Sequence, residues 1–247
     1  MAAAGAAAMT APLAVVIPCL QEAQRLPLLL ADLAAAPPGL IAEQLVVDGG
    51  STDGSGSLAA LAGAHGIRSA PGRGLQLQRG IAATSAPWLL LLHADARLPQ
   101  GWGAAVARAI DAGATAPEPL AWCFDLAVAQ AGLGLRLLER AVAWRTRLRQ
   151  LPYGDQGLLL PRSLLEACGG IQPLPLMEDL DLMLRLRRQA TVRSLGLALQ
   201  VDGRRWRRHG VLGTAWRNAG LRRAWRRGVS ADQLAARYYG RGQPKGR

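Results

Sequence analysis

Short apolar runs alternate with helical segments over the first 112 residues, and each run is followed by a turn rich in glycine or acidic side chains. The runs Leu13–Ile17, Gln44–Val47 and Trp88–Leu92 are almost continuously apolar, as expected of parallel strands that are buried on both faces. Helical spacing follows at 26–35, 54–64 and 75–84, and Pro99 suits the first turn of a further helix. This alternation predicts an α/β fold with a doubly wound, Rossmann-like, mostly parallel sheet flanked by helices.

The alternation weakens after residue 112. Strands are expected at 120–128, 157–160 and 191–201, and helices at 133–149, 162–167 and 179–188. The C-terminal segment has helical character and is rich in Arg and Trp. No internal repeat or Pro/Ser-rich linker divides the chain, so we expect a single domain over 13–240, with disordered tails at 1–12 and 241–247.

Acidic side chains are scarce in this chain, which has 17 Asp and Glu against 29 Lys and Arg and a net charge of +12. Several of them nevertheless follow predicted strands, where ligands bind in open α/β sheets. The cysteines Cys19, Cys123 and Cys168 form no CxxC pattern, which argues against a zinc site or a disulfide framework and favours a reducing, cytoplasmic location. No apolar run reaches the roughly 20 residues that a membrane span needs.

Two carboxylates follow the first two predicted strands. Glu22 comes after the first strand, and Asp48 ends the second and begins a turn that runs to Gly54. A carboxylate at such a strand end can accept hydrogen bonds from a nucleobase or a ribose, and the Gly49-Gly50 pair allows a ligand to approach the backbone. The alternative is a helix-capping turn, for which Asp53 alone would suffice.

Two further carboxylate motifs come later in the chain. In His93-Ala94-Asp95, Asp95 is a hard oxygen ligand suited to a divalent ion that bridges a diphosphate, although an ordinary turn aspartate is the alternative. Glu178, Asp179 and Asp181 begin a helix, where the dipole favours negative charge. They equally suit general base catalysis, with Asp179 as the base and Glu178 or Asp181 orienting the acceptor or capping the helix, because clustered carboxylates raise one another's pKa.

Two loops complete the set of candidate residues. In the polar loop 152–157, Gly154, Asp155 and Gln156 suit hydrogen bonding to a hydroxylated acceptor, but an ordinary Gly-Asp turn explains them equally well. Arg73 lies between two glycines just before a helix, which suits an anion, whereas a surface arginine is the plain alternative.

These motifs in this order resemble the inverting family-2 glycosyltransferases with the GT-A fold, over residues 14–239. Residues 15–22 are similar to the family's opening strand and Pro-x-x-Asn-Glu segment, 46–54 to its nucleotide-binding turn, 93–95 to its Asp-x-Asp metal motif and 178–179 to its catalytic Glu-Asp. Gln21 stands where Asn is common, and His93 stands where the family has Asp. Segments 72–76, 92–95, 152–157 and 204–206 resemble one branch, associated with radical-SAM, selenodomain or arsenosugar-biosynthesis genes.

The resemblance implies an inverting enzyme that moves a sugar from a nucleotide sugar, most often a UDP-sugar, to an acceptor hydroxyl. Residues 13–112 would form the nucleotide-binding half and 113–240 the acceptor half. The donor would be held by Pro18, Glu22, Asp48, Asp53, Arg73 and Asp95, and Asp95 would also bind Mg²⁺ or Mn²⁺. Asp179 would be the catalytic base, and the acceptor would contact Gly154, Asp155, Gln156 and Glu178.

The C-terminal segment is strongly basic. From Arg185 onward the chain carries 17 of its 29 basic residues against Asp202 and Asp232, with Trp206, Trp216 and Trp225 interleaved. The first interpretation is a solvated helical face with its tryptophans packed inward, and the second is peripheral binding to anionic lipid at the inner face of the membrane. We expect no binding of nucleic acid.

Three candidates in this segment, Arg205, Trp206 and His209, would bring positive charge to the diphosphate.

Two other functions stay open on the sequence alone. One is nucleotidyl transfer, which uses similar sheet and metal chemistry, and the other is a non-catalytic, basic membrane-surface protein that keeps the fold.

Overall fold

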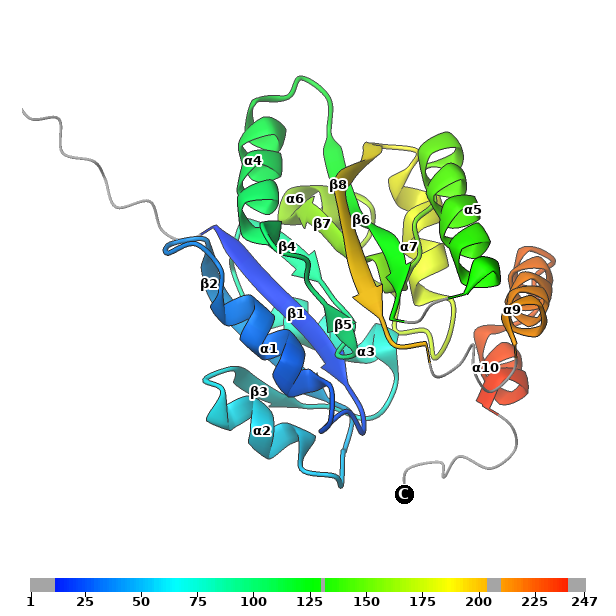
Figure 1. Ribbon diagram of the computed structural model, residues 1–247, viewed down its shortest axis with the longest axis horizontal. Helices are drawn as coiled ribbons and strands as arrows, with labels where there is room; N and C mark the ends of the chain where they lie inside the picture. Colours follow the sequence, from blue (N-terminus) through cyan, green and yellow to red (C-terminus); the bar gives the residue numbers. More distant parts are fainter. Residues whose placement is uncertain (1–11, 130–131, 204–209, 240–247) are drawn as a thin grey trace, which may run out of the picture.

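The computed structural model describes residues 12–129, 132–203 and 210–239, and its strands form one sheet in the order β3-β2-β1-β4-β7-β6-β8-β5 (Figure 1). The strands are β1 Leu13–Cys19, β2 Ile41–Asp48, β3 His65–Arg68, β4 Trp88–Leu91, β5 Ala96–Arg97, β6 Leu120–Val128, β7 Leu158–Pro161 and β8 Thr191–Val201. The helices are α1 Leu26–Ala34, α2 Ser55–Leu61, α3 Arg73–Ala82, α4 Trp102–Thr115, α5 Leu133–Arg149, α6 Arg162–Ala167, α7 Glu178–Leu186, α9 Val211–Arg226 and α10 Ala231–Tyr239, with a short 3₁₀ turn, η1, at Gly154–Gln156.

The sheet is mostly parallel and flanked by helices, as the alternating apolar runs predict. β1 pairs in parallel with β2 and β4, and β2 pairs in parallel with β3. The direction of β7 was not predicted: it runs antiparallel between β4 and β6. Because β4 precedes residue 112 and β7 follows it, this pairing joins the two expected halves in one sheet.

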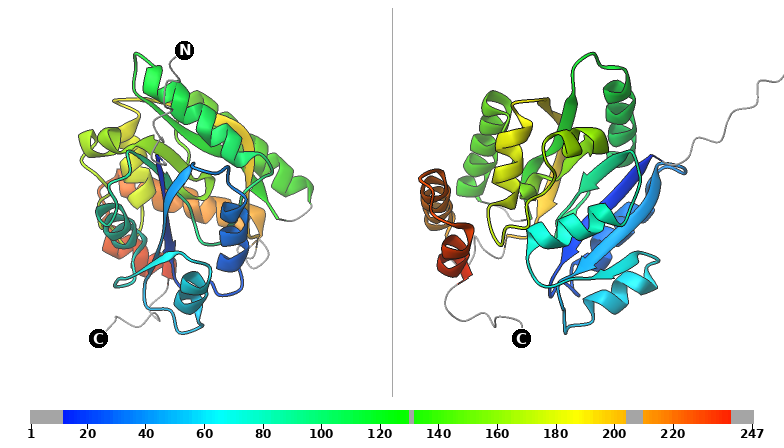
Figure 2. Two further views of the ribbon diagram at one scale, coloured as in Figure 1. Left: turned by 90° about the vertical axis from the view of Figure 1, so that its left-hand side faces the viewer. Right: turned by 180° about the vertical axis from the view of Figure 1, so that it is seen from behind.

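Both faces of the sheet are buried, which explains why the first strand is continuously apolar. Leu13, Val15 and Ile17 of β1 pack into the core beneath α1 and α4, whereas Ala14 and Val16 face the core shared with α3, α6 and α7. Figure 2 shows these helices on opposite sides of the sheet. The polar strand-end residues are thereby left at the carboxyl edge of the parallel strands.

The C-terminal helices cover one end of that edge. Leu221 and Leu234 pack against Leu176, Met177 and Leu180, so α9 and α10 rest on the first turn of α7. Trp225 is partly buried in the same cluster, as the first interpretation of the basic segment expects. That interpretation is wrong for Trp216, which is 78% exposed.

Some predictions fall on parts of the chain outside the described residues. These are the two tails, apart from Pro12, and the candidates Arg205, Trp206 and His209. Within the described ranges, no helix combines the length and the apolar composition needed to cross a bilayer.

Candidate active site

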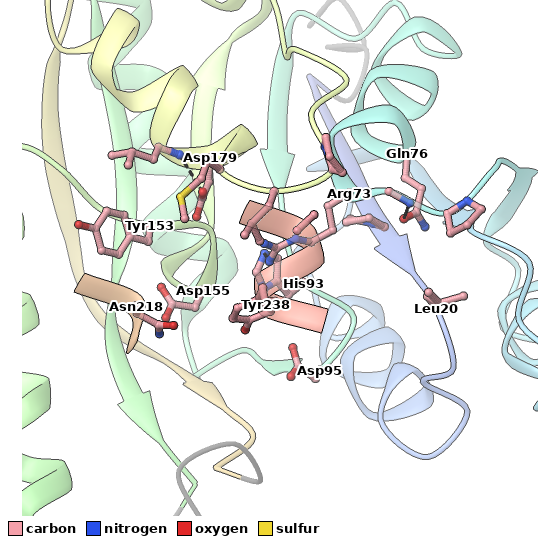
Figure 3. Close-up of a pocket in the computed structure, with 18 of the residues that line it drawn as sticks. Leu20, Arg73, Gln76, His93, Asp95, Tyr153, Asp155, Asp179, Asn218 and Tyr238 are labelled. Atoms are coloured by element: carbon pink, nitrogen blue, oxygen red, sulfur yellow. Dashed lines mark hydrogen bonds between the residues drawn. The ribbon is translucent and has the colours of Figure 1, made fainter. Parts of the chain in front are cut away.

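A cavity of about 940 Å³ lies at the carboxyl ends of β1 and β4, between the sheet edge and the helices α7, α9 and α10 (Figure 3). Six of the predicted site residues line it, although they are spread over more than 160 positions of the chain. They are Pro18, Glu22, Arg73, Asp95, Asp155 and Asp179. The strand-end rule therefore located the cavity, and the long-range folding of the chain brings Asp95 and Asp179 to the same opening.

The loop after β1 is tied to the turn after β2. The side-chain amide of Gln21 donates to Thr52 Oγ1 (2.9 Å) and accepts from the backbone N–H of Thr52 (3.2 Å). Asp53 Oδ2 accepts from the backbone N–H of Ala23 (2.9 Å), and the N–H of Glu22 donates to Ser55 Oγ (2.9 Å). These bonds fix Glu22 at the cavity wall and give Asp53 a structural role.

Asp48 and Asp53 lie beside the cavity rather than in its wall. Asp48 Oδ1 accepts from the backbone N–H and the hydroxyl of Ser51 (2.9 and 2.5 Å). The pKa of Cys19, which lines the cavity, is raised to about 11 by burial, and by the nearby negative charges of Asp48, Glu22 and Asp53. The three acids therefore gather at the end of β1, but direct contact of Asp48 and Asp53 with a nucleoside stays a prediction.

Gln76, whose structural role the sequence analysis did not anticipate, holds the strand ends together. It is 2% exposed, and its amide N–H groups donate to the carbonyl oxygens of Cys19 (2.8 Å) and Val47 (2.7 Å). Its carbonyl oxygen accepts from the N–H of Gly72 (3.3 Å). One side chain thus connects β1, β2 and the turn that carries Arg73. A glutamine three residues into a helix that follows a glycine-rich turn was the available signal.

Arg73 connects the strand ends to α7. Its Nε lies 2.8 Å from Glu178 Oε1, and its Nη1 lies 3.4 Å from His93 Nε2. Gly74 is required next to it, because a Cβ atom there would overlap the backbone carbonyl of Gln172. Figure 3 shows Arg73 and His93 together at the centre of the cavity, between Asp179 on one side and Gln76 on the other.

Asp179 is held in a fixed orientation at the cavity wall. Its Oδ2 accepts from the backbone N–H of Gly154 (2.9 Å), and its Oδ1 accepts from the N–H of Leu180 (2.7 Å). A Cβ atom at Gly154 would lie 2.8 Å from His93 Nε2, so a glycine permits this close approach. Gly154, expected to contact the acceptor, is therefore seen to position the carboxylate.

Two residues expected at the acceptor are instead inside the protein. Gln156 is fully buried, and its amide donates to the carbonyl of Phe124 (3.0 Å) and accepts from Arg145 (2.9 Å). Glu178 is 1% exposed and faces Arg73. Neither side chain lines the cavity in this conformation, whereas Asp155 from the same loop does.

Burial raises the pKa of Glu178, an effect that Asp179 increases and Arg73 partly offsets. Between the unfolded pKa and this raised value, the folded protein keeps a proton that the unfolded chain has released. The free energy of unfolding should therefore fall as pH rises through that window, by up to about 1.4 kcal/mol per pH unit. Urea unfolding measured at several pH values between the two pKa values should show no such fall in Glu178→Gln. Glu166→Gln, which changes a 67% exposed side chain, should keep the fall. An unchanged pH slope in Glu178→Gln would contradict the raised pKa.

The side of the cavity formed by α9 and α10 contains residues that the sequence analysis missed. Thr214, Asn218 and Arg222 are spaced four residues apart along α9 and line the cavity, as does Tyr238 of α10. The hydroxyl of Thr214 is buried without a hydrogen-bond partner among the described residues. The guanidinium of Arg222 lies 4.9 Å from the ring centre of Tyr153, another lining residue. The four-residue spacing of these polar residues could have indicated in the sequence that they share one face of a helix.

Comparisons with known proteins indicate a glycosyltransferase. Residues 14–118 match the sequence model of Glycosyl transferase family 2. Uncharacterized glycosyltransferases of Mycobacterium bovis and Mycobacterium tuberculosis are 34% identical over 147 residues, which cover 57% of this chain. The match spans 62% of the length of those relatives.

Solved structures support the same fold. Glucosyl-3-phosphoglycerate synthase from Mycobacterium tuberculosis, in complex with Mn²⁺, UDP and glucosyl-3-phosphoglycerate, superposes with a TM-score of 0.54 and 22% identity, over 75% of this chain and 70% of that one. Its complex with Mn²⁺ and UDP-glucose gives a TM-score of 0.55 over 75% and 69% of the two chains. The fold is thus the α/β GT-A-like fold of glycosyltransferases, as the sequence motifs imply.

Proposed function

We propose that this protein is an inverting glycosyltransferase that moves a sugar from a nucleotide sugar, with UDP-sugars as the first candidates, to a hydroxyl of an acceptor. The observation that carries the proposal is that Asp95 and Asp179 line one cavity, together with Pro18, Glu22 and Arg73. The match to the glycosyltransferase family supports it, and so does a structural neighbour solved with UDP-glucose and phosphoglyceric acid. The branch associated with radical-SAM, selenodomain or arsenosugar genes is part of the proposal, supported by Gln76 and His93 at the site.

Asp179 would remove the proton of the acceptor hydroxyl. Both of its oxygens accept backbone N–H groups, which fixes the carboxylate while leaving it at the cavity wall. The acceptor oxygen then bonds to the anomeric carbon as the bond from that carbon to the diphosphate oxygen breaks on the opposite face. The electron pair of the broken bond leaves with the nucleoside diphosphate, and Arg73 would offset the charge that develops there.

The acceptor would lie between Asp179 and the polar stripe of α9. Thr214, Asn218 and Arg222 supply a hydroxyl, an amide and a guanidinium on that wall, and Asp155 lies on the loop beside it. Such groups suit a hydroxylated acceptor. Phosphoglyceric acid, bound by the structural neighbour, is the first acceptor to test.

A divalent ion fits this site only together with the donor. Among the described residues, no group of three or more His, Cys, Asp and Glu side chains is arranged to hold a metal by itself. Mg²⁺ and Mn²⁺ are commonly held by one or two carboxylates together with substrate phosphates, and Asp95 offers one such carboxylate. When bound, the ion would supply positive charge that neutralises the leaving diphosphate.

Mn²⁺ should therefore strengthen the binding of UDP, and Asp95 should be needed for that effect. We expect Asp95→Asn to reduce the gain in UDP affinity caused by Mn²⁺ at least about tenfold, measured by isothermal titration with and without the metal. Asp111→Asn, on an exposed position of α4, should keep the full gain. If Mn²⁺ increased the UDP affinity of Asp95→Asn as much as that of the unmodified protein, Asp95 would not be a metal ligand.

The overall activity is tested by a panel of UDP-, GDP- and dTDP-sugars, first for thermal stabilisation and then for turnover. Release of a nucleoside diphosphate, with the sugar on an acceptor, supports the proposal, whereas release of pyrophosphate would indicate nucleotidyl transfer. Absence of stabilisation by every donor would favour the non-catalytic interpretation.

A further inference from the structure

The outer face of α5 carries an apolar stripe. Leu133, Leu137, Trp144 and Leu148 are 84%, 64%, 65% and 62% exposed. Their spacing of four, seven and four residues places them within about 60° of arc on a helix with 3.6 residues per turn. The opposite face of the helix is buried, because Leu135 and Val142 pack against β6 and β8. α5 therefore has one apolar face more than the fold needs.

A row of arginines runs beside this stripe. Arg136, Arg140 and Arg147 are exposed and share the four- and seven-residue spacing, each offset toward one side of the stripe. None of the ion pairs formed by the described residues involves them. The only acid of the helix, Glu139, is partly buried and accepts from the backbone N–H of Val128 (2.8 Å). The exposed face is thus apolar and cationic at once.

The neighbouring helix extends the positive charge. α9 contacts α5, lies beside it in Figure 1, and has four arginines and no acid over its sixteen residues. Trp216 of α9 is also highly exposed. An amphipathic helix with aromatic and leucine side chains next to arginines is the pattern of helices that lie in the interface of an anionic membrane.

We propose that α5 docks this protein onto an anionic lipid surface, with Leu133, Leu137, Trp144 and Leu148 inserted at the headgroup boundary and Arg136, Arg140 and Arg147 on lipid phosphates. A second copy of the chain fits the stripe less well, because two such faces would bring their arginine rows together without acidic partners from α5. The surface differs from the Arg/Trp-rich segment expected from the sequence, where Trp225 packs inward. The proposal does not depend on the transferase activity.

The test is co-sedimentation of the full chain with vesicles of phosphatidylcholine alone or mixed with phosphatidylglycerol. The unmodified protein should bind the mixed vesicles and lose that binding at high salt. The double variant Leu137→Gln/Trp144→Gln should bind roughly tenfold or more weakly, and the triple variant Arg136→Gln/Arg140→Gln/Arg147→Gln about 100-fold more weakly. Leu61→Gln, on an 84% exposed leucine of α2, is the matched control and should bind like the unmodified protein.

The variants should fold because all the changed side chains are exposed, and circular dichroism checks this. Equal binding to neutral and mixed vesicles, no binding to either, or unchanged binding of both α5 variants would overturn the proposal. Sedimentation velocity adds one more outcome. A dimer that the Leu137→Gln/Trp144→Gln variant loses would assign the stripe to a second copy of the chain, and this too would overturn the lipid proposal.

Discussion

Asp179→Asn should lower the rate of sugar transfer by about 100- to 10,000-fold, the range typical for loss of a general base. The asparagine keeps the size of the side chain and can still accept one of the two backbone N–H groups, from Gly154 or Leu180. What it loses is the ability to take the acceptor proton. Binding of UDP, measured by titration calorimetry, should stay within a few fold, because none of the donor contacts proposed above is made by Asp179.

Asp181→Asn separates this effect from a change in charge at the start of α7. Asp181 belongs to the same first turn, but it pairs with Arg185 (2.6 Å) and does not line the cavity. We expect its variant to keep the turnover of the unmodified enzyme. Full activity in Asp179→Asn would reject Asp179 as the base, whereas equal losses in both variants would indicate a general effect on the helix.

The sequence predicted those parts of the fold that depend on local pattern. The uniformly apolar segment 13–17 indicates burial on both faces, and β1 is buried on both faces. Strand direction depends on pairing with distant residues. For this reason the antiparallel placement of β7 between β4 and β6 had no signal in residues 157–160.

The candidate site shows the same division between local and distant information. Strand-end position placed Glu22 and Asp95 at a common cavity, because the carboxyl edge of a parallel sheet is a property of the topology. Asp179 reaches the same cavity from the first turn of α7. The loop motif does not show whether a side chain is buried. Gln156 was therefore expected to contact the acceptor, although its amide forms its hydrogen bonds inside the protein. The polar residues of α9 that line the cavity were missed because they lie between the arginines of that helix, which drew attention to its charge.

Gln76→Glu should destabilise the protein by about 3 kcal/mol or more, although it changes a single NH₂ group to oxygen. In the native structure that NH₂ donates to the carbonyl oxygens of Cys19 and Val47 (2.8 and 2.7 Å). A carboxylate would face two acceptors without a proton, in a position that is 2% exposed. A protonated carboxyl would satisfy only one of them. Urea unfolding at neutral pH measures the loss, and it should be smaller at acidic pH, where the carboxyl binds its proton.

The same substitution should weaken donor binding, because Gln76 joins the ends of β1 and β2 to the turn that carries Arg73. Thermal stabilisation by UDP with Mn²⁺ should therefore fall in Gln76→Glu. The matched control is Gln78→Glu, two residues further along α3 on an exposed position, which should change stability by less than about 0.5 kcal/mol. If Gln76→Glu were as stable as Gln78→Glu, the amide bridge would not be what holds the strand ends together. If it were unstable yet still bound UDP normally, the bridge would stabilise the sheet without shaping the donor side of the cavity.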